Sequence, residues 1–301
     1  MPPKISVIIP TYNSAKTLQR TLYSVFKQTL TPHEIIVVDD GSWDDTIEIL
    51  KSYGSKIKFI CQGNSGASAA RNKGASLATG DVIAFLDSDD IWHNRKLEMQ
   101  AEVFDKDKSV GICTTAYGVC TAYDDIDAEE FTDSEMPKMK YREIKFAQVF
   151  TSPYLLPSST AVRKNIFDHL GGFDETLETA EDIDLFLRLC FVTRYIFVEN
   201  TLCYYIRQEG SLSTSAKKSP FESHLDVIEK FCFLEKSFTK ANRNRIGVVK
   251  SSIYTNWGSA ELSQGRFGNA ASKLSRAIKI RPSLRAVYLL IKSIYFSLKS
   301  K

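Results

Sequence analysis

Residues 81–90 read DVIAFLDSDD, a short apolar run that ends in a cluster of acids. The run at 82–85 has the length and composition of a buried strand. Asp87, Asp89 and Asp90 follow it within four positions. Carboxylates this close repel one another at a desolvated strand end unless a cation or a row of hydrogen-bond donors meets them. The stretch therefore predicts a core strand that leads into a site for a divalent metal ion.

Similar apolar runs recur on both sides of this stretch. Runs at 5–9, 34–39, 57–61, 81–86 and 110–117 predict strands, and segments at about 15–28, 44–53, 66–78 and 94–106 predict helices. Alternation of strand and helix predicts right-handed crossovers and a mostly parallel central sheet. The expected fold class is thus α/β and Rossmann-like.

Polar residues collect where the first four predicted strands end. They occupy positions 10–13 (PTYN), 39–42 (DDGS), 62–66 (QGNSG) and 87–90 (DSDD). Ligands of parallel sheets bind at the carboxyl ends of the strands. These four strand ends therefore predict one crevice of nucleotide size. Mg²⁺ or Mn²⁺ at the acidic run would bridge to the phosphates of a ligand that carries a diphosphate.

The second half of the chain is less regular. Residues 121–157 are polar and acidic and predict an excursion or flap, whereas 159–163, 195–200 and 202–208 predict further strands. Glu181, Asp182 and Asp184 open an apolar segment of helical spacing, which suits the positive end of a helix dipole.

Beyond about residue 220 the pattern is helical only, and 257–283 resembles one tetratricopeptide unit of two packed helices. We therefore expect two domains, a catalytic one at 1–215 and a helical region at 216–301.

The composition is that of an ordinary globular chain of 301 residues with a net charge of +3, which predicts no nucleic-acid partner. Six cysteines without CxxC spacing are typical of buried reduced thiols in a reducing compartment. The start of the chain lacks the apolar core of a secretory signal, and no run of about 18 apolar residues follows. A cytoplasmic location is expected.

The C-terminal tail differs in charge from the rest of the chain. From Lys240 to Lys301 the only acid is Glu261. Residues 286–298 (AVYLLIKSIYFSL) read either as a packing helix or as a helix that lies on the inner face of a membrane, and the sequence leaves both open.

Five motifs in fixed order give the chain a family resemblance. They are VIIPTYN at 7–13, VVDDGSWDDT at 37–46, GNSGASAARNKG at 63–74, FLDSDD at 85–90 and GGFDETLETAEDIDL at 171–185. The set, which spans about 4–210, resembles the family 2 glycosyltransferases of GT-A fold. Such enzymes move a sugar from a nucleotide diphosphate to an acceptor hydroxyl with inversion at the anomeric carbon.

The resemblance implies roles for individual residues. Pro10, Thr11, Tyr12 and Asn13 would line the nucleobase, Asp40 would accept from its imide N–H, Arg71 would lie over the nucleotide and Asp87 would reach the ribose or sugar. An imide points to a UDP-type donor. Asp89 would ligate Mn²⁺ or Mg²⁺, and Asp182 would be the base that deprotonates a hydroxyl of a glycan or lipid-linked acceptor.

Three further contacts with the acceptor or diphosphate are expected at Trp92, Glu181 and Arg207. Trp92 either stacks on a sugar ring or packs against the sheet. Arg207 lies in YYIRQEGSLS, where the family often folds a loop over the diphosphate.

The same residues allow other interpretations. The acids could be solvated caps, and Glu181 and Asp182 could only favour a helix start. A receiver module needs its acidic pair after the first strand, where this chain has PTYN. A nucleotidylyltransferase would have a glycine-rich loop there. A catalytically weak scaffold that acts through its helical tail is disfavoured because both Asp89 and Asp182 are present.

Overall fold

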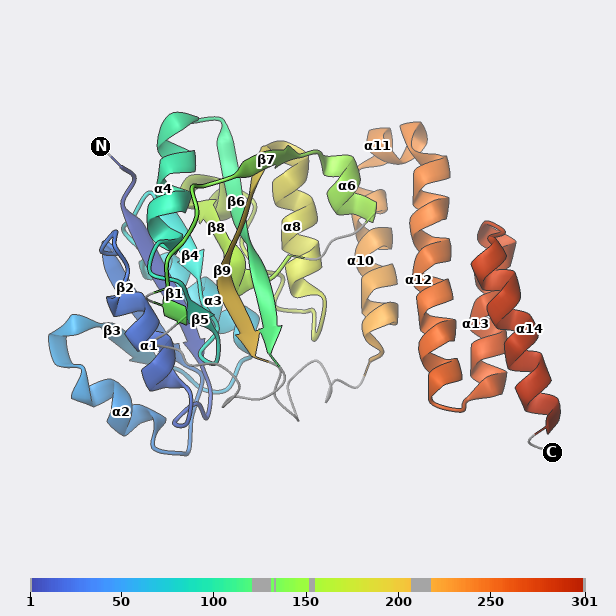
Figure 1. Ribbon diagram of the computed structural model, residues 1–301, viewed down its shortest axis with the longest axis horizontal. Coiled ribbons are helices and arrows are strands. Elements are labelled where there is room, and N and C mark those ends of the chain that lie inside the picture. The colour runs from blue at the N-terminus through green and yellow to red at the C-terminus, as the bar shows by residue number, and fades with distance from the viewer. Residues whose placement is uncertain (1, 121–130, 133, 152–154, 207–217, 300–301) are drawn as a thin grey trace. The chain divides into compact units, whose positions relative to one another are not determined.

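The computed structural model describes residues 2–120, 131–132, 134–151, 155–206 and 218–299 (Figure 1). The chain divides into two compact units. Unit 1 comprises Met1–Val149 and Pro153–Ser215, and unit 2 comprises Phe150–Ser152 and Ala216–Lys301. The short segment at 150–152 thus groups with the C-terminal helices, although the sequence placed it in the first domain.

Unit 1 is built on one sheet, which has nine strands within the described residues. The strands are β1 (Ile5–Thr11), β2 (Glu34–Asp39), β3 (Lys58–Cys61), β4 (Val82–Phe85), β5 (Ile91–Trp92), β6 (Val110–Cys120), β7 (Tyr141–Ile144), β8 (Thr160–Arg163) and β9 (Arg194–Ile206). Their order is β3-β2-β1-β4-β8-β6-β9-β5, and β7 pairs with β9.

The first four strands of the chain pair in parallel, with β1 between β2 and β4. β8 runs antiparallel between β4 and β6, and β6 pairs in parallel with β9. Every residue of β1 and β4 is buried, because both faces of these central strands are covered. The α/β class and the mostly parallel sheet are confirmed, and the carboxyl ends of β1, β2, β3 and β4 meet at one edge.

Five helices of unit 1 lie where the sequence predicts them: α1 (Leu18–Phe26), α2 (Thr46–Ser52), α3 (Ala67–Leu77), α4 (Lys96–Lys106) and α8 (Glu181–Val192). Two short helices were not predicted, α7 (Lys164–His169) and α6 (Phe146–Thr151), and the end of α6 groups with unit 2. 3₁₀ turns lie at Gly54–Lys56 and Pro157–Ser159. α3 packs on β1 and β2, and α4 packs on β6 and β9. The apolar faces of these helices complete the core.

The sequence predicted two strands at 195–200 and 202–208, and this was wrong. β9 is continuous, because shifts in its register with β6 at Thr115, Ala116 and Tyr117 absorb the irregularity. The polar stretch at Glu199 and Asn200 reads as a turn but remains in the strand. The Asn200 side chain accepts from Lys140 N at 3.0 Å, so a neighbouring segment satisfies it.

The predicted excursion at 121–157 also contributes to the sheet. Its residues 141–144 form β7, which pairs antiparallel with β9. Residues 121–130, 133 and 152–154 of this segment lie outside the described part of the chain.

Unit 2 is helical. Its elements are α10 (Pro220–Leu234), α11 (Lys236–Ala241), α12 (Arg243–Ser263), α13 (Phe267–Ile280) and α14 (Leu284–Lys299). α10, α12, α13 and α14 pack side by side in chain order (Figure 1). α12 and α13 approach each other closely at Gly258 of α12, where an added Cβ would lie 2.5 Å from Leu274 Cγ. None of the described helices combines the length and the apolar character needed to cross a bilayer.

Candidate active site

The loops after β1 and β2 are bonded to each other. Asn13, with a positive φ of 48°, turns its backbone so that Asn13 N donates to Ser42 Oγ at 2.8 Å. Trp43 N donates in return to Asn13 Oδ1 at 3.0 Å, and Ala15 N donates to Asp44 Oδ2 at 3.1 Å. Pairing between loops reduces their freedom, so this edge of the sheet is preorganised.

Asp40 joins the loop after β2 to the loop after β3. Its Oδ1 accepts from Gln62 Nε2 and Ser65 N, both at 2.8 Å, and its Oδ2 accepts from Gly66 N at 2.8 Å. Only 4% of Asp40 is exposed. The carboxylate therefore already has three donors, and an imide N–H would use its remaining lone pairs.

The acidic loop after β4 is anchored at both ends. Ser88 Oγ lies 2.7 Å from Ser14 Oγ in the loop after β1. Asp90 is fully buried, and its Oδ1 accepts from the backbone of Ile206, the last residue of β9, at 3.1 Å. The loops after β1 and β4 and the last residue of β9 thus meet at the acidic run.

Arg71 connects the acidic loop to a distant helix. Its Nη2 donates to Asp87 Oδ1 at 2.7 Å, and its Nη1 lies 3.3 Å from Glu181 Oε1 at the start of α8. Only 5% of Arg71 is exposed. Burial alone would lower the pKa of this guanidinium, but the charges of Asp87 and Glu181 outweigh burial and raise it. Arg71 therefore links Asp87, in the predicted donor site, to the start of the helix that contains the predicted base, Asp182.

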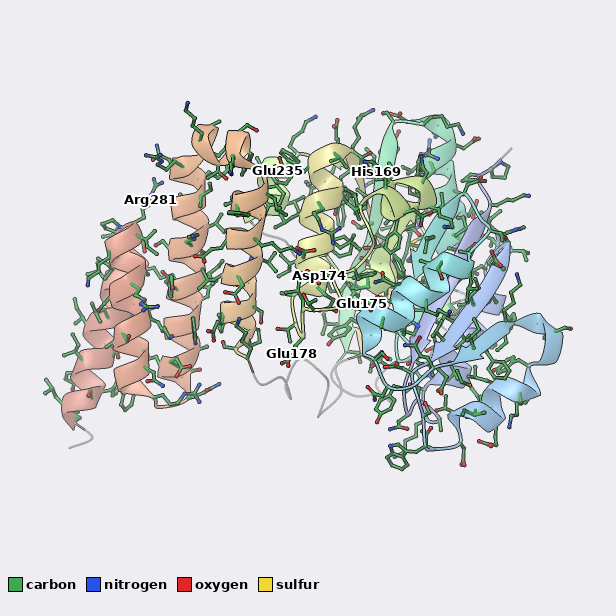
Figure 2. All side chains as sticks on the ribbon, turned by 180° about the vertical axis from the view of Figure 1, so that it is seen from behind. His169, Asp174, Glu175, Glu178, Glu235 and Arg281 are labelled. Atoms are coloured by element: carbon green, nitrogen blue, oxygen red, sulfur yellow. The ribbon has the colours of Figure 1, made fainter. Side chains whose placement is uncertain are left out.

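The start of α8 is held by a turn that contacts α3. Asn72 Nδ2 donates to Phe173 O and Asn72 Oδ1 accepts from Phe173 N, both at 2.9 Å. Gly172 has a positive φ of 69°, and an added Cβ would lie 2.5 Å from Asn72 Oδ1, so this position requires glycine. Figure 2 shows Asp174 and Glu175 on the segment that leads from this turn to α8.

Asp182 lies in the first turn of α8. The preceding Ala180 adopts the left-handed conformation at a φ of 65°, a strained geometry for a residue with a side chain. Burial and then the charge of Glu181 raise the pKa of Asp182 to about 7. A carboxyl with this pKa both holds and releases a proton near neutral pH, as a general base must.

Pro10 and Thr11 end β1 and are buried, whereas 46% of Tyr12 is exposed beside them. Of the four residues predicted to line a nucleobase, Tyr12 offers the largest open surface. Trp92 has no exposed surface, and its Nε1 donates to Ser158 O at 2.7 Å. The packing role of Trp92 is therefore correct and the stacking role is not. Arg207 lies outside the described residues.

A cavity of about 530 Å³ lies elsewhere in unit 1, beside the opposite end of β4. Gly80, Asp81, Lys108 and Arg163 are among the residues that line it. It contains none of the predicted site residues.

The sequence pattern of "Glycosyl transferase family 2" matches residues 6–171, more than half of the chain. The chain belongs to glycosyltransferase family 2. The resemblance that the motifs indicated is confirmed.

Curated relatives of this glycosyltransferase include polysaccharide synthases. The chain is 31% identical to chondroitin synthase of Escherichia coli over 75% of its own length and 32% of that protein's length. It is 29% identical to glycosyltransferase GlyG of Streptococcus pneumoniae over 69% of its own length and 72% of GlyG. The chain spans about a third of the length of the first relatives that it matches.

The solved structure of Staphylococcus aureus TarS 1–349 in complex with UDP-GlcNAc has the same fold. Its TM-score with this chain is 0.68 at 22% identity, covering 96% of this chain and 89% of that one. The GT-A fold of the glycosyltransferase is thereby confirmed.

The acidic loop of the glycosyltransferase fits a divalent cation electrostatically. Burial and the charge of Asp87 raise the pKa of Asp89 to about 7, and burial raises that of Asp90 well above its usual range. A nearby cation would relieve this repulsion. Within the described ranges, no group of three His, Cys, Asp or Glu side chains is arranged to hold a metal. Mg²⁺ commonly takes one or two carboxylates and completes its shell with water and substrate phosphates, so Asp89 is compatible with such a site.

Three residues that help to build the site of this glycosyltransferase were missed by the sequence analysis. Asp44 accepts from Thr46 N at 3.1 Å, a local pattern typical of a helix start that the sequence does show. Ser14 and Ser158 act through tertiary contacts, since Asp87 N donates to Ser158 Oγ at 3.0 Å. No local signal distinguishes these two serines.

Proposed function

We propose that this glycosyltransferase transfers a sugar from a UDP-sugar to a hydroxyl of a glycan or lipid-linked acceptor, with inversion and with a divalent metal. The observation that carries the proposal is the position of Arg71 between Asp87 and Glu181. This ion-pair arrangement brings Asp87, after β4, next to the first turn of α8, which contains Asp182.

The donor would occupy the edge where β1 to β4 end. Tyr12 and Asn13 provide surface for the base, Asp40 provides an acceptor for an imide N–H, and Asp87 lies where a ribose or sugar hydroxyl would approach. UDP and UDP-GlcNAc are bound in solved structures of TarS, which supports a uridine nucleotide here. When bound at Asp89, Mn²⁺ or Mg²⁺ neutralises charge on the diphosphate leaving group.

Asp182 would act as the base. It accepts the proton of the acceptor hydroxyl while that oxygen forms a bond to the anomeric carbon and the bond from that carbon to the diphosphate breaks. The hydroxyl becomes acidic only as it bonds to carbon, so a carboxylate with a pKa near 7 suffices. Attack from the face opposite the leaving group inverts the anomeric carbon.

Polysaccharide synthases among the relatives support a glycan acceptor in the formation of a cell-envelope polysaccharide. Four of the six cysteines are buried, as is typical of reduced thiols that pack as small hydrophobic side chains, which supports work in the reducing cytoplasm.

The decisive experiment measures UDP release from a panel of UDP-sugars with Mn²⁺, with Mg²⁺ and with EDTA. We expect one donor to be turned over, and EDTA to abolish the reaction. Turnover that is indifferent to EDTA would contradict the metal assignment. Release of a different nucleotide from another sugar nucleotide would contradict the UDP assignment.

Asp182→Asn tests the base. The variant should bind UDP as tightly as the wild type, because Asn retains the size and polarity of the side chain, but transfer should fall by about 10² to 10⁴. UDP affinity is measured by calorimetry and transfer by product formation. Normal turnover in this variant would place the base on another residue.

A further inference from the structure

The last helix of unit 2 presents an apolar stripe to solvent. Eight large apolar residues of α14 are exposed, and one of them, Phe296 at 37%, stacks on Phe267 of α13. The other seven have exposed fractions of 92% at Leu284, 39% at Val287, 64% at Tyr288, 62% at Ile291, 48% at Ile294, 51% at Tyr295 and 72% at Leu298. Their spacing of three and four residues places them on one face of the helix. At about 100° per residue this face is roughly 120° wide.

The opposite face of α14 is occupied. Ala286 and Ser293 are fully buried, and Ser293 Oγ donates to Phe267 O of α13 at 2.6 Å. α14 lies beside α13 in Figure 1. The helix is thus fixed by one face while the apolar stripe stays open. A contiguous exposed apolar stripe of this kind marks an interaction surface.

Basic side chains run along one border of the stripe. Arg285, Lys292 and Lys299 recur every seven residues, and α14 has no acid. Lys299 Nζ lies 4.8 Å from the centre of the Tyr295 ring, so this lysine extends over the stripe. The only acid between Lys240 and Lys301, Glu261, is paired with Arg266. The surface that covers the stripe must therefore tolerate or prefer positive charge.

We propose that α14 binds flat on an anionic phospholipid bilayer. The seven apolar residues enter the boundary between headgroups and acyl chains, and Arg285, Lys292 and Lys299 meet lipid phosphates. A second copy of the chain is disfavoured because it would bring like charges together. A single partner helix is disfavoured because a two-helix seam is narrower than this stripe.

The test is co-sedimentation of the full chain with vesicles of phosphatidylcholine alone and of phosphatidylcholine with phosphatidylglycerol. We expect pelleting with the anionic vesicles, little with the neutral ones, and a marked loss at high salt. Lys292→Gln and Lys299→Gln should each weaken binding to anionic vesicles by about fivefold. A control pair, Lys51→Gln with Lys56→Gln, removes the same charge from unit 1 and should bind as the wild type does.

The apolar stripe is tested with Ile291→Ser and Leu298→Ser combined, which should abolish pelleting. Both side chains are largely exposed, so the fold should tolerate the change, and circular dichroism checks this. Phe233→Ser with Leu234→Ser is the matched control, since these α10 residues are 73% and 58% exposed. Equal pelleting of both double variants overturns the proposal.

Two other results would also overturn it. One is the absence of wild-type pelleting with anionic vesicles, which would leave an acidic protein as the occupant. The other is a pair of results for the double variant Ile291→Ser with Leu298→Ser. If the wild type is a dimer in analytical ultracentrifugation, and the variant is monomeric but still binds vesicles, the stripe is a dimer interface. Sugar transfer does not enter these readouts, so they are independent of the proposed function.

Discussion

The Arg71 guanidinium is shared by two carboxylates from different ends of the site. Asp87 follows β4 and Glu181 begins α8, and each is only partly exposed. A buried cation between two acids is stabilising only while both contacts persist, because removal of one partner leaves an uncompensated charge. The residue is therefore structural as well as adjacent to the chemistry.

Arg71→Lys should lower the free energy of unfolding by about 3 kcal/mol, because an ammonium lacks the fork that contacts both acids. Urea denaturation measures the change. Arg95→Lys is the matched control, since Arg95 pairs with Glu98 at the surface and such pairs contribute under about 1 kcal/mol. If both variants lose the same free energy of unfolding, the ion pairs of Arg71 with Asp87 and Glu181 contribute no more than a surface pair does.

The pH profile should report Asp182. Its pKa of about 7 means that kcat/KM falls below pH 7, as the base becomes protonated, and levels off above. Glu181→Gln removes the negative neighbour that helps to raise this pKa, so the midpoint should move to lower pH. Glu178→Gln, on the exposed segment before α8, should leave it in place. A profile that is flat from pH 5 to 8 would contradict the assignment.

Sequence patterns singled out the candidate site residues whose chemistry is visible locally. Acids directly after apolar strands, as at Asp40 and Asp87, were predicted because such clusters are rare without a function. The pairing of Arg71 was not predictable, because it depends on two segments 16 and 110 residues away meeting in space. Trp92 was ambiguous for a similar reason, since only its packing shows that it is covered.

At the scale of elements, prediction succeeded where one pattern continued without interruption. β4 is apolar throughout and β1 is apolar except at Ser6 and Thr11, and both were placed within two residues of their observed ends. β9 was divided because Glu199 and Asn200 imitate a turn. The bulges that keep this strand continuous arise from its pairing with β6, which its own sequence does not encode.

Two glycines of α12 offer a matched test of helix packing in unit 2. Gly258→Ala should lower the melting temperature, because the new Cβ would lie 2.5 Å from Leu274 Cγ and cost about 1–3 kcal/mol. Gly247→Ala meets nothing within 4 Å and should raise stability by up to about 1 kcal/mol. Calorimetry distinguishes the two. An increase in both variants would show that α12 and α13 are not closely packed at Gly258.

At the scale of the whole molecule, the expected boundary near residue 215 separates helices from sheet but divides a cluster of aromatic rings. Phe150 belongs to unit 2, where its ring lies 6.0 Å from that of Phe231 and 5.2 Å from that of Phe238. Sequence patterns could not predict these ring contacts, because Phe150 and Phe231 are far apart in the chain.

A chain that ends at residue 215 should therefore self-associate, since truncation removes Phe231 and Phe238 and uncovers Phe150. The same truncated chain with Phe150→Ser should be more monomeric. Light scattering after size-exclusion chromatography measures both. If the two truncated chains behave identically as monomers, Phe150 does not depend on the C-terminal helices for its burial.

The shared guanidinium also constrains how this enzyme can be altered. A substitution that removes the Asp87 charge would leave Arg71 with Glu181 alone of these two acids, and would alter the field at Asp182, on whose pKa both Arg71 and Glu181 act. The effects of substitutions at Asp87 and Glu181 should therefore not be additive. If Asp87 and Asp182 have the roles proposed above, donor preference and proton transfer would have to be engineered together.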